Sequence, residues 1–227
     1  MHSVGGEVNI EEGALMKDER YVLPALASVT GLAWMAAVLL ISANHKGIDP
    51  SGDRAYDWAN RAHTLALLLL LATVIAIHRT IRSRRLTGRR ATTALVVGAA
   101  LMLVGNIVAF WGALFTDGTA EEFWGGLAGW IIFLPGSVLV LGGFIGLAIA
   151  AGSWTGISTA RRWQIGSLGL LLNITTITWA GPVVVTLVPA LLAAFALLAT
   201  GTSVAQAQPE PDSPTSPRPA GAHTSTS

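Results

Sequence analysis

Long apolar runs dominate the chain and are separated by short polar segments. A helix rises 1.5 Å per residue, so crossing about 30 Å of hydrocarbon takes roughly 20 apolar residues. Four runs reach this length, at residues 22–43, 62–81, 91–115 and 124–151. Each of them predicts one membrane-spanning helix.

The fifth apolar block, residues 163–200, is too long for one span and about right for two. A Trp-Ala-Gly-Pro sequence that starts at Trp179 interrupts it, because glycine permits a turn and proline cannot continue the preceding helix. We therefore expect spans over 164–180 and 183–200. A single re-entrant excursion is the alternative.

The pattern predicts an all-α fold, a polytopic membrane helix bundle with six transmembrane helices over residues 22–200. The polar tail before it, residues 1–21, is longer and more acidic than the basic start of a cleaved signal peptide, so we expect the first run to be a span. Residues 201–227 are rich in Pro, Ser and Thr and cannot bury a core. They predict a disordered carboxy-terminal tail.

The composition agrees with this class. The chain is 52% hydrophobic and 12% charged, with a mean hydropathy of +0.58. Soluble domains carry about 25% charged residues. There is no cysteine, which excludes disulfides and thiol nucleophiles.

Basic residues predict the orientation. Six spans put both termini on one side, and eleven of the fourteen Lys and Arg residues fall on that side. We therefore expect cytoplasmic termini in a plasma membrane, because basic loops stay inside. A patch that binds phosphate or lipid headgroups is the alternative for the loop between spans two and three. Its arginines are Arg79, Arg82, Arg84, Arg85, Arg89 and Arg90.

All Asp, Glu, Lys and Arg residues can be assigned to loops, tails or helix ends. Proton-coupled transporters and intramembrane acid catalysts place such groups near the midplane, although each costs at least about 2.5 kcal/mol there. The distribution argues against these classes. His63 and His78 lie at opposite ends of span two and cannot ligate one haem, and no nucleotide or metalloprotease motif occurs. We expect no cofactor, no metal and no nucleic acid partner.

Span four carries a stripe of small residues at every seventh position. Such a stripe lets helix backbones approach closely, and Pro135 predicts a kink beside it. A central packing helix is the main interpretation, and a moving hinge or a face for a homodimer or another membrane protein is the alternative. The stripe consists of Gly129, Gly136, Gly143 and Ala150.

Polar and aromatic residues gather in the outer halves of spans two, three and five. If these faces converge, they line a polar pocket for a neutral or lipid-like small molecule. Alternatively, the polar side chains only join helices and the Trp residues mark the membrane interface. The candidate pocket residues are His63, Asn106, Trp111, Asn173, Thr176 and Trp179.

The first outer loop offers the third candidate site. We expect span two to begin near Gly52 and to project from the membrane, with Asp53, Asp57 and Arg61 on one face, where Asp57 and Arg61 can pair. Asp53, Asp57 and His63 are the candidate catalytic residues of a membrane enzyme. These acids can also form a cation or headgroup site, or simply be solvated.

Several local features accompany the six-span plan. Together they resemble a broad group of small six-span integral membrane proteins of high-GC bacteria that have no assigned activity. The resemblance implies the architecture and no functional residue. A non-enzymatic accessory, sensor-partner or scaffold protein is the main functional hypothesis. The features are Asp49, Pro50, Asp53, His63, the loop 82–90 and Arg161-Arg162-Trp163.

Overall fold

The computed structural model describes residues 8–45, 54–111, 127–178 and 182–209, with side chains from residue 21 onward. Helices account for nearly all of this part of the chain, so the predicted all-α class is confirmed. The elements are α1 (Val8–Asn44), α2 (Arg54–Ser83), α3 (Arg89–Trp111), α5 (Gly129–Ala150), the 3-10 helix η3 (Ala151–Ser153), β1 (Trp154–Thr155), α6 (Thr159–Thr178), α7 (Val183–Gln206) and β2 (Gln208–Pro209).

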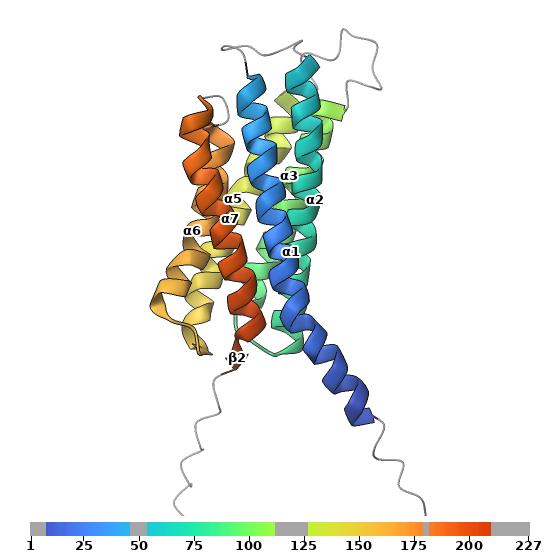
Figure 1. The fold of residues 1–227 in the computed structure, drawn as a ribbon, viewed down its shortest axis with the longest axis vertical. Helices are drawn as coiled ribbons and strands as arrows, with labels where there is room; N and C mark the ends of the chain where they lie inside the picture. The colour runs from blue at the N-terminus through green and yellow to red at the C-terminus, as the bar shows by residue number, and fades with distance from the viewer. Residues whose placement is uncertain (1–7, 46–53, 112–126, 179–181, 210–227) are drawn as a thin grey trace, which may run out of the picture.

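The six α-helices of the described part of the chain form a closed ring (Figure 1). Each of them packs against the next described helix along the chain, and α7 returns to pack against α1. That closing contact is close. A Cβ atom on Gly31 would lie 2.9 Å from Cα of Ala194, and one on Gly201 would lie 2.6 Å from Cβ of Ala27. Because the ring has an even number of members, α1 begins and α7 ends at the same end of the bundle.

Five of the helices are long and apolar enough to cross a membrane: α1 from Tyr21 onward, α2, α3, α5 with the turn after it, and α7. The sixth, α6, has 20 residues but falls short in apolarity. Its first turn contains Arg161 and Arg162, and Asn173 and several threonines follow. The apolar helices indicate a membrane-embedded protein, whereas the sixth span stays a prediction.

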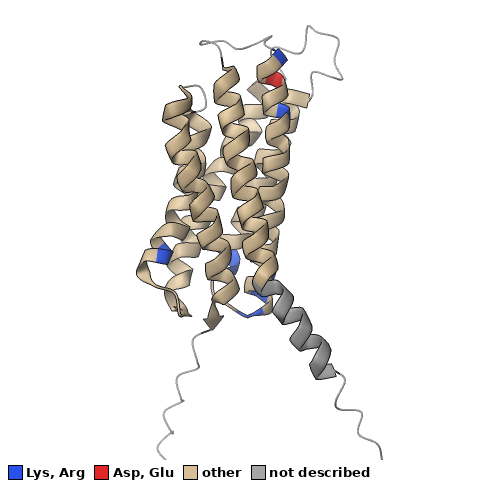
Figure 2. Cartoon of the chain, viewed as in Figure 1, with Lys and Arg blue, Asp and Glu red and all other residues tan. Residues whose placement is uncertain are grey.

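Charged residues lie at the two ends of the bundle in the part whose side chains are described (Figure 2). On α2, Arg61 and Arg79 are separated by uncharged helix that is about 27 Å long. That length is close to the roughly 30 Å thickness of bilayer hydrocarbon. Among the residues whose side chains are described, all eight charged residues at the end where α1 begins and α7 ends are arginines.

The carboxy-terminal boundary differs from the prediction. The helix α7 continues to Gln206, past the predicted end at residue 200, and β2 then pairs with β1. Arg84 explains the extension, because its guanidinium donates to the carbonyl oxygens of Ala205 (2.8 Å) and Ala207 (3.3 Å) and so caps the helix. The predicted disorder of residues 210–227 lies outside the described residues.

Helix α1 also begins earlier than its predicted span. It starts at Val8, within the segment 1–21 that was expected to be a polar tail. This segment contains Ala, Leu, Met, Lys and Glu, which are good helix formers, so it extends the helix beyond the apolar part. The predicted membrane boundary near residue 22 agrees with the apolar portion, which starts at Tyr21.

Candidate functional site

The predicted outer pocket contains a hydrogen-bonded chain between α2 and α3. The hydroxyl of Thr64 donates to Oδ1 of Asn106 at 2.8 Å. The hydroxyl oxygen of Thr64 in turn accepts the indole N–H of Trp111 at 2.9 Å. Asn106 is 2% exposed and Thr64 is 8% exposed, so both polar groups are satisfied by each other inside the bundle. Two of the predicted pocket residues, Asn106 and Trp111, therefore meet through Thr64.

Arg61 covers the outer end of this chain. Its Nε donates to the carbonyl oxygen of Phe110 at 2.6 Å, and its guanidinium lies 5.0 Å from the ring centre of Trp58 and 6.0 Å from that of Trp111. The last carbonyls of a helix lack intrahelical partners and attract cations, so Arg61 caps α3. The sequence predicted an Asp57 partner for this arginine. The structure adds a role that spacing along α2 alone could not reveal.

The remaining pocket candidates point to other neighbours. The side-chain amide of Asn173 donates to the carbonyl oxygens of Ser137 (3.2 Å) and Gly169 (2.8 Å), so it joins α6 to α5. The hydroxyl of Thr176 donates to the carbonyl oxygen of Leu172 in its own helix. Asn106 and Asn173 thus bind different elements. Trp179 lies outside the described residues.

His63 lies in the interior of the ring and is fully buried. Its ring meets that of Trp34 edge to face, with the centres 4.9 Å apart. The indole N–H of Trp34 donates in turn to Oγ1 of Thr175 at 3.0 Å, so this cluster joins α1, α2 and α6. Trp34 was not among the predicted site residues. A lone Trp inside an apolar run was the available signal.

Two of the three candidate catalytic residues are described, and they lie on different faces of one helix. Asp57 and His63 both lie on α2, six residues apart, which is about 120° around the helix and 9 Å along it. Asp57 is partly buried in the first turn, and Asp53 lies outside the described residues. Within the described ranges, no group of three or more His, Cys, Asp or Glu residues could hold a metal ion.

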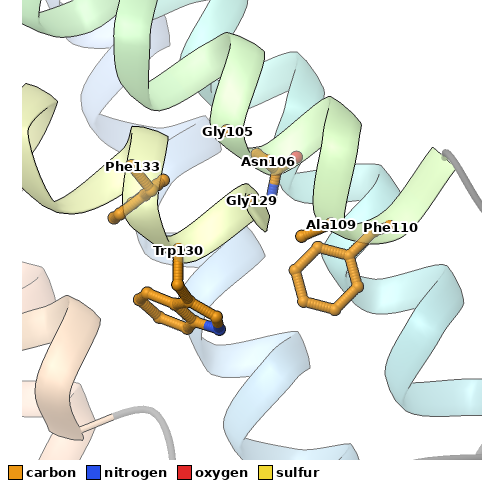
Figure 3. Close-up of a pocket in the computed structure, with 7 residues that line it drawn as sticks. All are labelled: Gly105, Asn106, Ala109, Phe110, Gly129, Trp130 and Phe133. Atoms are coloured by element: carbon orange, nitrogen blue, oxygen red, sulfur yellow. The ribbon is translucent and has the colours of Figure 1, made fainter. Parts of the chain in front are cut away.

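The space beside Asn106 is small (Figure 3). A hollow of about 10 Å³ lies between α3 and α5. A water molecule needs about 10–15 Å³ of such volume, so there is room for roughly one. The rings of Trp130 and Phe133 pack edge to face at 5.4 Å along one wall. The hollow is lined by Gly105, Asn106, Ala109, Phe110, Gly129, Trp130 and Phe133.

The small-residue stripe of α5 meets a matching stripe on α3. A Cβ atom on Gly105 would lie 2.7 Å from the carbonyl oxygen of Gly129, and the reverse distance is also 2.7 Å. Gly98 and Gly136 are related in the same way, again at 2.7 Å in both directions. Real Cβ contacts are longer than this, so only glycine fits at these crossings.

The close pairing of α3 with α5 continues toward the arginine-rich end of the bundle. A Cβ atom on Gly143 would lie 3.1 Å from the carbonyl oxygen of Ala91, and one on Gly88 would lie 3.1 Å from Cβ of Ala150. The residues Ala91, Gly98 and Gly105 therefore repeat every seven positions, antiparallel to the predicted stripe. The partner of that stripe is thus within the same chain. The α3 stripe was not predicted, although its spacing is visible in the sequence.

The comparisons with known proteins provide no further guide. The chain matches no protein family, no curated protein and no solved structure. The features that bear on its function are the polar contacts that join its helices and the distribution of charge along the bundle.

Proposed function

We propose that this protein is a six-span integral membrane protein of the plasma membrane that acts through helix packing, as an accessory or scaffold protein with both termini in the cytoplasm. The observation that carries the proposal is that buried polar side chains form hydrogen bonds between neighbouring helices. Thr64 and Asn106 join α2 to α3, Trp34 and Thr175 join α1 to α6, and Asn173 joins α6 to α5. These groups hold helices together.

The position of α6 supports a sixth span. Thr186, in the first turn of α7, donates to the carbonyl oxygen of Thr178 at 2.7 Å and to Oγ of Ser42 at 3.3 Å. Ser42 lies near the end of α1, at the end of the bundle away from the termini. The helix α6 therefore runs from the arginine-rich end to the opposite end. Its arginines, Arg161 and Arg162, come first and fit an interfacial position.

Single cysteines test this topology, since the chain has none of its own. We expect a membrane-impermeant maleimide to label Arg54→Cys and Val183→Cys in intact cells, and Thr155→Cys only after permeabilisation. Labelling of Val183→Cys and Thr155→Cys from the same side would reject α6 as a span. Labelling of Thr155→Cys alone from outside would reject the proposed orientation.

A scaffold also requires a protein partner, and α6 is the helix where we expect one. Of the six described helices it alone falls short of the apolarity of a membrane span, and α5 and α7 flank it, so its outward side is where a partner would shield it. A photocrosslinker placed at Trp163, Leu170 or Ile177, all more than half exposed, should give a discrete protein adduct in cells. The same probe at Val184 or Val188 of α7 is the matched control. Equal absence of adducts at both helices would reject the scaffold role.

Binding of a neutral small molecule in the outer pocket has less support. The hollow beside Asn106 is about 10 Å³, whereas ligand pockets usually measure about 300–1,000 Å³. Asn106 and Asn173 would also have to leave their present partners before they could face one ligand.

A further inference from the structure

A groove of about 540 Å³ lies on the outer surface between the start of α3 and the second half of α5. This volume falls within the roughly 300–1,000 Å³ that is usual for ligand sites. Small residues and two arginines form most of it, namely Arg89, Arg90, Ala91, Ala94, Gly142 and Gly146.

The floor of the groove is open because glycine replaces larger side chains there. A Cβ atom on Gly142 would have no other atom within 4 Å, so the position faces free space. Ile145 and Ile149, on the same side of α5, are 46% and 71% exposed. This side of the helix therefore faces the surroundings of the bundle. In a bilayer those surroundings are hydrocarbon, and an open groove with an apolar floor of this kind can hold an acyl chain.

One end of the groove is strongly basic. Arg89 and Arg90 are both exposed, and within the described residues neither guanidinium has a hydrogen bond or an ion pair. Among the residues whose side chains are described, the other charges at this end of the bundle are also arginines, with no carboxylate among them. Gly142 lies eight residues, about 12 Å, before the end of α5, so the apolar floor extends from the charged end into the membrane.

We infer that this groove binds one anionic phospholipid, with the phosphate at Arg89 and Arg90 and an acyl chain along Gly142 and Gly146. The inference rests on the membrane placement proposed above. That placement puts the arginines at the cytoplasmic leaflet, where anionic lipids concentrate. Basic pockets between helices on this side are known to hold anionic headgroups. The lipid also covers the nearby contact between Ala91 and Gly143 and should stabilise the packing of α3 on α5.

The test uses the full-length protein in a zwitterionic detergent, with phosphatidylglycerol as the probe and phosphatidylcholine, whose headgroup has no net charge, as the comparison. Native mass spectrometry counts retained lipid, and thermal unfolding measures stabilisation. We expect one phosphatidylglycerol per chain, with a higher Tm than with phosphatidylcholine. The affinity should fall about fivefold for each arginine removed by Arg89→Gln or Arg90→Gln.

Gly142→Leu tests the apolar half of the site. A Cβ atom at this position meets no other atom within 4 Å, so the variant should fold normally, and the longer leucine side chain should fill the floor and displace the retained lipid. It also keeps the inference testable if the arginine variants unfold. The matched charge control is Arg79→Gln/Arg82→Gln, which removes two exposed arginines near the same end but outside the groove and should retain the lipid.

Three results would overturn the inference. The first is unchanged phosphatidylglycerol retention in Gly142→Leu and in the Arg89 and Arg90 variants. The second is equal retention of phosphatidylcholine, and the third is equal stabilisation by inorganic phosphate, which would make this a free-anion site. Binding in detergent does not depend on orientation, so a failed cysteine-labelling result together with intact binding would reject the topology alone.

Discussion

Gly105 of α3 and Gly129 of α5 touch backbone to backbone, and a Cβ atom on either one would come within 2.7 Å of the other's carbonyl oxygen. Between membrane helices the lipid is as apolar as the side chains, so association depends on close packing and on interhelical hydrogen bonds. The contact between α3 and α5 uses the first of these. The contact between α2 and α3, through Thr64 and Asn106, uses the second.

Gly136→Ala should destabilise the protein by about 1–3 kcal/mol, because the new methyl group would overlap backbone atoms of Gly98 and Met102. Gly142→Ala is the matched control in the same helix. It meets no atom and replaces a poor helix former, so it should leave the stability unchanged or raise it. Thermal unfolding of both variants in detergent checks this. Equal stability of the two would contradict the close approach.

Asn106→Leu should lower the free energy of unfolding by less than Gly136→Ala does. Interhelical hydrogen bonds in membranes average about 0.6 kcal/mol and reach roughly 1.7 kcal/mol. A double-mutant cycle with Thr64→Val should give a coupling free energy in this range, because Thr64 donates directly to Asn106. No coupling between the two positions would show that this bond does not form in the membrane protein. A larger loss than for Gly136→Ala would argue against packing as the main source of stability.

Thr175→Val removes the acceptor of a fully buried indole N–H on Trp34. An unsatisfied buried donor costs about 1–3 kcal/mol, so the free energy of unfolding should fall by that amount. Thr175→Ser keeps the hydroxyl and serves as the control. Its loss should be distinctly smaller when both variants are unfolded by heat under the same conditions.

Arg84→Gln should loosen the carboxy-terminal end of α7. The substitution removes the guanidinium that binds the carbonyl oxygens of Ala205 and Ala207, and a cation at a helix end contributes about 0.3–1 kcal/mol. Amide hydrogen exchange should therefore accelerate over residues 201–209 and stay unchanged in α3. Arg82→Gln, an exposed neighbour, should have no such effect. Unchanged protection in Arg84→Gln would mean that the helix needs no cap.

Much of the fold was predictable because hydrocarbon imposes simple demands on length and charge. The apolar runs became helices, and the described charges lie at the bundle ends, as the sequence indicated. The order in which the helices pack around the ring was harder to predict from the sequence. A side chain such as Val138, 64% exposed, and one such as Val140, fully buried, are equally apolar, so hydrophobicity does not mark the inner face of a span.

In the candidate site, too, some features could be predicted from the sequence and others depend on the packing of the helices. The stripe through Gly129 and Gly136 was visible, and its counterpart through Gly98 and Gly105 could have been found from the identical spacing. The hydrogen-bond partner of Asn106 could not have been found from the sequence, because several threonines lie at similar depth and only the packing of the helices selects Thr64. Arg84 and Arg61 illustrate the limit for charges. The count of basic residues on each side of the membrane predicted a topology. The roles of these two arginines as helix caps depend on the tertiary structure.

The return of α7 onto α1 has a consequence for biogenesis. Ribosomes deliver α1 first and α7 last, yet the tight crossings at Gly31 and Gly201 require both. During translation α1 must therefore remain in the bilayer without its packing partner, with its small-residue face in contact with lipid or with a chaperone. A nascent chain that stops before α7 leaves that face uncovered and becomes a natural substrate for membrane quality control.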